Sequence, residues 1–119
     1  MKHEFYKKII DTTNREYHMV KTEANFIILE HFNFTKKNYA GLQELIDEIE
    51  KSKTLQKGNE FRWGNEDVII HANENGVLLV DEMAQLGGEL NPEDITLRLT
   101  HSEILAFLQD FKKFIEENI

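Results

Sequence analysis

The chain has no cysteine, a single proline and six glycines among its 119 residues. Without cysteine there can be no disulfide, thiolate nucleophile, thiolate zinc site or iron–sulfur cluster, and we expect a protein of the reducing cytoplasm. The apolar runs at residues 26–29 and 77–80 have four residues each, whereas a membrane-spanning helix needs roughly 20. The basic N-terminus has only Ile9 and Ile10 as an apolar run before Asp11, unlike a signal peptide. We therefore expect no membrane partner.

Basic residues are also scarce, because 14 Lys and Arg stand against 22 Asp and Glu, giving a formal net charge of −8. Binding to the phosphates of nucleic acid depends on Lys and Arg, so we expect no nucleic-acid partner. Apolar residues make up 40% of the chain and charged residues 30%, a composition that can bury a core. At this length we expect a single domain over residues 1–119, without repeat or linker.

Strand-like composition dominates the N-terminal third. Residues 4–10 and 17–34 mix β-branched and aromatic residues with charges, and turn-forming residues at 11–14 separate them. The pattern predicts two or three strands.

A helix is predicted over about residues 37–53, because Tyr39, Leu42 and Ile46 keep the i, i+3, i+7 spacing of one buried stripe. Gly58 follows as a left-handed stop. The basic residues that suit the negative end of the helix dipole are Lys51, Lys53 and Lys57.

Short strands separated by turns are predicted for the next part of the chain. The expected strands cover residues 59–63, 67–73, 77–82 and 95–99. The Asn75-Gly76 pair is typical of a tight turn, so the second and third of these strands should form a hairpin. Residues 84–92, with Gly87-Gly88, are interpreted as an irregular loop.

The C-terminal helix has the clearest signal, because Thr100 and Glu103 match a capping box and an apolar face follows. Its expected buried residues are Ile104, Phe107, Leu108, Phe111, Phe114 and Ile115. Together these elements predict an α+β fold: one antiparallel sheet of five to seven short strands with two helices packed on one face.

No arrangement of residues indicates an enzyme, a cofactor or a metal site. The five histidines are scattered without a metal-binding spacing, and His71 is interpreted as a strand residue facing water. There is no Gly-x-Ser-x-Gly nucleophile motif, and no Gly-Lys-Ser/Thr follows Gly87-Gly88 to make a phosphate loop. The carboxylate pairs Glu66-Asp67 and Asp81-Glu82 could supply a general acid and base, but we interpret them as solvated charges.

Acidic residues concentrate in one segment. Residues 1–40 carry seven Lys or Arg against five Asp or Glu, whereas residues 60–94 carry nine acids against Arg62 alone. We expect the strands of this segment to hold its charges together and to steer a basic protein partner. The predicted partner-binding residues are Glu60, Glu66, Asp67, Glu74, Asp81, Glu82 and Glu89. The alternative is an acidic face that serves only solubility.

The chain resembles the YacL-like family of small, acidic, uncharacterised bacterial proteins. The residues that carry the resemblance are Glu4-Phe5, Gly58-Asn59-Glu60-Phe61, Trp63, Glu66-Asp67-Val68, Ala72-Asn73-Glu74, Asp81-Glu82-Met83, Leu97, Phe107 and Phe114. The resemblance covers most of the chain, with insertions around residues 77–80 and 87–88, and implies a fold but no reaction. At the level of class, the chain is also similar to the small, acidic immunity proteins of toxin systems, including contact-dependent growth inhibition.

Three hypotheses follow. The first is an immunity protein that blocks the basic active site of a cognate toxin, which we expect to be a nuclease. The second is a YacL-like housekeeping binding module, dimeric or monomeric. The third is an enzyme whose carboxylate or histidine cluster forms only in the folded chain.

Overall fold

The computed structural model describes residues 2–10, 15–88 and 91–119. Its elements in chain order are β1 (His3–Ile10), β2 (Arg15–Thr22), the 3₁₀ helix η1 (Ala24–His31), β3 (Phe34–Thr35), α1 (Ala40–Ser52), β4 (Phe61–Gly64), β5 (Val68–Asn73), β6 (Gly76–Asp81), α2 (Glu82–Leu86), α3 (Pro92–Ile95), β7 (Thr96–Leu99) and α4 (His101–Glu117).

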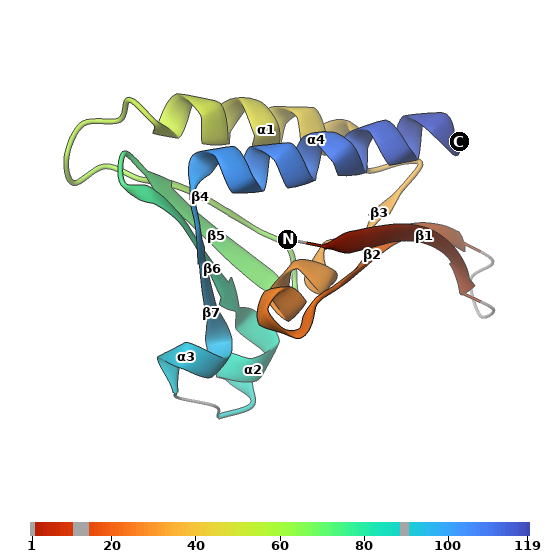
Figure 1. Ribbon diagram of the computed structural model, residues 1–119, viewed down its shortest axis with the longest axis horizontal. Coiled ribbons are helices and arrows are strands. Elements are labelled where there is room, and N and C mark those ends of the chain that lie inside the picture. Colours follow the sequence, from red (N-terminus) through yellow and green to blue (C-terminus); the bar gives the residue numbers. More distant parts are fainter. Residues whose placement is uncertain (1, 11–14, 89–90) are drawn as a thin grey trace.

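Two sheets and a pair of long helices make up the fold (Figure 1). The helices α1 and α4 lie side by side, β4-β5-β6-β7 form one antiparallel sheet, and β1-β2-β3 form another. The α+β class is confirmed. The expected single sheet is wrong, because β3 pairs over two residues only and α1 separates it in the chain from β4. The two expected helices, α1 and α4, are present, and the structure adds three short helices, η1, α2 and α3.

The sequence predicted strand structure for the segment after β2, and this is wrong. The segment forms the 3₁₀ helix η1. Its backbone is kinked at Phe26, whose φ of −118° and ψ of 18° are not helical, and Phe32 follows its last residue. Leu29 and Phe32 are fully buried and Phe26 packs against the core. Glu30 holds the start of this segment, because its carboxylate accepts hydrogen bonds from the backbone N–H and the hydroxyl of Thr22.

The four-stranded sheet follows the predicted strands within about two residues at each end. The β5–β6 hairpin is confirmed, with Asn73 paired to Gly76 across a turn at Glu74 and Asn75. Gly76 has a φ of +143°, and a Cβ there would lie 3.2 Å from the carbonyl oxygen of Leu99 in β7. Glycine therefore serves both the turn and the close approach of β7.

The helix α1 begins three residues later and ends one residue earlier than predicted. A preceding turn accounts for the late start, since Thr35 and Asn38 exchange hydrogen bonds between side chain and backbone. Gly58 has the expected left-handed φ of +91°, but it follows a further turn and does not itself end the helix.

The helix α4 forms as predicted, and both hydrogen bonds of its capping box are present. Glu103 N–H donates to the hydroxyl of Thr100 (3.1 Å), and Thr100 N–H donates to the carboxylate of Glu103 (2.9 Å). These hydrogen bonds hold the pKa of Glu103 below its ordinary value of 4.5.

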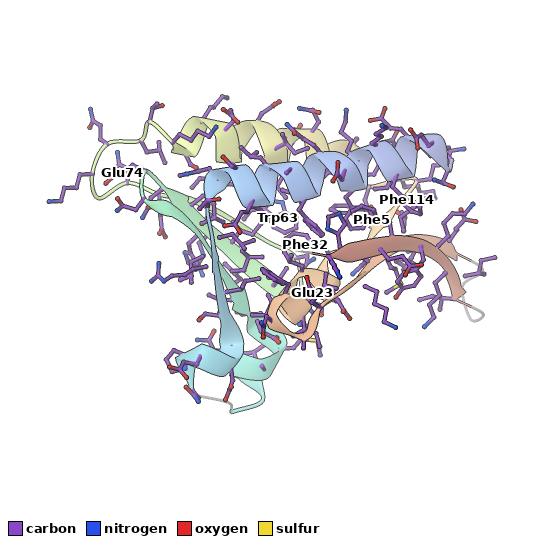
Figure 2. The ribbon with its side chains drawn as sticks, in the orientation of Figure 1. Phe5, Glu23, Phe32, Trp63, Glu74 and Phe114 are labelled. Carbon is purple, nitrogen blue, oxygen red and sulfur yellow. The ribbon has the colours of Figure 1, made fainter. Side chains whose placement is uncertain are left out.

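An aromatic core lies beneath α4 and joins the two sheets (Figure 2). From the three-stranded sheet, Phe5 contacts the rings of Phe107, Phe111 and Phe114 at 4.7–5.9 Å between centroids. From the other side, Phe32 stacks on Trp63 of β4 at 5.8 Å. Because α4 packs against residues of both sheets, the two sheets share one core.

The region interpreted as an irregular loop, residues 84–92, contains the last three residues of α2 and the first residue of α3. Asp81 begins α2, since its carboxylate accepts a hydrogen bond from Ala84 N–H. Asn91 begins α3 in the same way, with Pro92 at the first helical position. Gly87 and Gly88 are exposed turn residues between them. Asp81 and Asn91 are both residue types that favour the N-cap position, so the sequence carries a local signal for each helix.

Candidate protein-binding surface

Four of the predicted partner-binding residues come together at one end of the four-stranded sheet. Glu66 and Asp67 form the turn between β4 and β5, while Asp81 and Glu82 stand where β6 becomes α2. The register pairs Val68 with Asp81, and Glu82 N–H donates to the carbonyl oxygen of Asp67 at 3.0 Å. The two acidic pairs are therefore neighbours in space.

The β4–β5 turn is held by Asn65. Its side-chain oxygen accepts hydrogen bonds from the backbone N–H groups of Asp67 (2.7 Å) and Val68 (2.9 Å). Its amide nitrogen donates to the carbonyl oxygen of His31 at 3.2 Å. This turn is thereby tied to the end of η1, so the carboxylates of Glu66 and Asp67 project from an ordered backbone.

Two further carboxylates join this end of the sheet from α3, which lies beside α2 (Figure 1). They belong to Glu93 and Asp94, and both residues are exposed. The helix leads directly into β7, whose Thr96 pairs with Val80 near the end of β6. We call the resulting surface the acidic end. It comprises Glu66, Asp67, Asp81, Glu82, Glu93 and Asp94.

The acidic end has no Lys or Arg in the segments that build it, residues 64–67, 81–88 and 91–96. It does have two exposed apolar side chains on α2, Met83 (59% exposed) and Leu86 (78% exposed). Protein interfaces commonly surround apolar anchors with polar residues, and methionine adapts to varied partners. The sequence interpretation missed both anchors because it assigned no helix here. The N-cap signal of Asp81 could have found them.

Asp81 has a structural role at this end. Its carboxylate lies 3.0 Å from Nε2 of His31 and also caps α2, and its side chain is only 18% exposed. We therefore count Asp81 as support for the acidic end and Glu66 and Glu82 as candidates for direct contact.

The other predicted residues lie elsewhere. Glu74 is in the β5–β6 turn, at the opposite end of the sheet (Figure 2). Glu60 precedes β4 and contacts Nδ1 of His71 at 3.1 Å, so it also stands away from the acidic end. Glu89 lies outside the described residues. The sequence expectation of one continuous acidic surface therefore holds for only part of the segment.

His71 faces away from the core, as expected, since its strand neighbours Ile70 and Ala72 are buried. Within residues 2–10, 15–88 and 91–119, no three His, Asp or Glu side chains are placed to hold a metal ion. No helix in this described part is long and apolar enough to cross a membrane.

The fold and the acidic end define a small α+β protein with a candidate surface for a basic partner. Comparison with family models, curated proteins and solved structures gives no significant match. The resemblance to the YacL-like family and the class-level similarity to immunity proteins both stay predictions.

Proposed function

We propose that the protein is an inhibitor of another protein: an immunity protein that neutralises a cognate bacterial toxin in the cytoplasm by covering its basic active site. A nuclease is the toxin class we favour, because a site that binds phosphates is basic. The inhibitor acts by occupation, without chemistry of its own.

The observation that supports this proposal is the acidic end itself. Six carboxylates lie there around exposed Met83 and Leu86, and the segments that build it contain no Lys or Arg. Such a surface steers a basic partner through its field and offers apolar contacts once the partner has docked.

The first test uses a nuclease domain encoded immediately upstream of this gene, with its activity and its association rate measured at two salt concentrations. Reversing Glu66 and Glu82 to Lys should slow association and flatten its salt dependence, because part of the steering field is lost. The matched control reverses Glu44 and Glu117, which are exposed on α1 and α4 and change the net charge equally. Equal inhibition by both double variants would contradict the proposal.

A dimeric binding module is the second candidate function, favoured by the eight-residue strand β1. This strand lies at the edge of its sheet, and its exposed residues include Tyr6 (39%) and Ile9 (56%). Edge strands with exposed apolar residues are suited to pairing with another chain. Sedimentation equilibrium should then show a dimer that Ile9→Lys weakens. A monomer at all concentrations would exclude this candidate.

A further inference from the structure

A second charged feature lies on the face of the four-stranded sheet that points away from the core. The strand register pairs Arg62 with His71, His71 with Leu78, and Leu78 with Arg98. Paired residues of antiparallel strands project to the same side of a sheet. These four side chains therefore form one row across β4, β5, β6 and β7, and their buried strand neighbours, such as Ile70 and Leu79, face the helices.

The sign of this row is opposite to that of the acidic end. Arg62 and Arg98 are the only Lys or Arg between Lys57 and Lys112, and both are exposed. Among the described residues, neither guanidinium forms an ion pair. The fold thus gathers the two cations of a strongly acidic segment on one face and leaves them without a carboxylate of this part of the chain.

An open hollow of about 480 Å³ lies beside this row, and we call it the Arg98 hollow. Its lining includes Glu60, His71, Gly76, Leu78 and Arg98. The volume is within the range of about 300–1,000 Å³ that small-molecule sites occupy. His71 and Arg98 flank Leu78 from either side, two strand spacings or about 10 Å apart, so a compact ligand can reach both.

Hydrogen bonds hold the walls of the Arg98 hollow. Nδ1 of His71 contacts the carboxylate of Glu60 at 3.1 Å. At the hairpin, His101 of α4 donates from Nε2 to the carbonyl oxygen of Asn73 at 2.8 Å, and Asn75 N–H donates to the side chain of Asn73 at 2.9 Å. The start of α4 thereby anchors the β5–β6 turn that closes one side of the hollow.

One group of the lining suits an anion. The carboxylate of Glu60 is engaged by Nδ1 of His71 at 3.1 Å, so these two side chains satisfy each other in the wall of the hollow and Arg98 is the cation that faces a ligand. The guanidinium of Arg98 presents several N–H donors in one plane, a geometry that matches carboxylate and phosphate oxygens. Leu78 supplies an apolar floor between the two polar groups.

We propose that the Arg98 hollow binds a small oxyanion, a carboxylate or phosphate group on a compact ligand, through the guanidinium of Arg98 beside the apolar side chain of Leu78. This site is separate from the acidic end, because the row His71, Leu78 and Arg98 lies toward the β5–β6 turn and carries the opposite charge.

The test is a titration followed by ¹H–¹⁵N correlation NMR, with sodium phosphate and sodium succinate as probes at constant ionic strength. Saturable shifts are expected at residues 71, 76–78 and 98, and the stronger probe identifies the preferred oxyanion. Arg98→Gln should weaken binding at least tenfold. Arg62→Gln is the matched control, because it removes an exposed arginine of the same row that does not line the hollow. The affinity of this variant for either probe should stay within about twofold of the wild-type affinity.

Three results would overturn the proposal: no saturable shift with either probe, the same affinity in Arg98→Gln, or the largest shifts at the lysines of β1 and β2. Arg98→Lys adds a check on geometry. It keeps the charge but not the planar fork, so its affinity should fall between those of the wild type and Arg98→Gln. Spectra of each variant that match the wild type away from residues 60–101 show that the fold is retained.

Discussion

The carboxylate of Asp81 lies 3.0 Å from Nε2 of His31, joining the start of α2 to the end of η1. The same carboxylate accepts a hydrogen bond from Ala84 N–H. One residue that charge placement alone assigns to partner binding therefore connects two helices that are 50 residues apart in the chain.

Asp81→Ala should lower the free energy of unfolding by about 1–2 kcal/mol, because a helix cap and the contact with His31 are lost together. The neighbouring change Glu82→Ala should alter it by less than about 0.5 kcal/mol, since Glu82 makes no such side-chain contact among the described residues. Urea unfolding at pH 7 measures both. Equal stability of the two variants would mean that the contacts of Asp81 add nothing to folding.

Phe107→Ala and Phe111→Ala should each cost about 3–5 kcal/mol of stability, because both rings are almost fully buried beneath α4. Leu86→Ala is the control, since a side chain that is 78% exposed contributes little to the core. Thermal unfolding followed by circular dichroism distinguishes them. An unchanged melting temperature for both phenylalanine variants would contradict the described core.

The capping box predicts a pH effect at Glu103. Hydrogen bonds from Thr100 lower the pKa of Glu103 in the folded state, so its contribution is present above the ordinary value of 4.5 and is lost as the pH falls through the folded-state pKa. At pH 7 the free energy of unfolding of the wild type should be about 0.3–1 kcal/mol higher than that of Glu103→Gln, because glutamine keeps the cap but not the charge at the helix N-terminus. Urea unfolding at pH 7 and pH 3 should show this difference shrinking in acid. A constant difference would rule out the ionised carboxylate as its cause.

Two glycines should respond to alanine in opposite ways. In α1, a methyl group added at Gly41 would meet no neighbouring atom within 4 Å, so Gly41→Ala should stabilise the protein by about 0.5–1 kcal/mol. Gly76→Ala should destabilise it by more than about 1 kcal/mol, because of the positive φ and the carbonyl oxygen of Leu99 at 3.2 Å. Denaturant midpoints give the comparison, and a shift of both variants in the same direction would contradict it.

Signals that act over a few residues were enough to predict much of the fold. The capping box of Thr100 and Glu103, the apolar stripe of α1 and the tight-turn signal of Asn75 and Gly76 each depend on neighbours within about one helical turn or one hairpin. The α+β class followed from them. The missed helix α2 carried a local signal as well, in the cap at Asp81.

Only the tertiary structure decided how these elements meet. Charge counting located an acidic segment, but strand register sent Glu66 and Asp81 to one end of the sheet and Glu74 to the other. The two sheets share one core because α4 packs against both of them. The contacts His31–Asp81 and Glu60–His71 join residues from different elements. No local pattern encodes such pairings, because they depend on the register and packing of whole elements around a shared core.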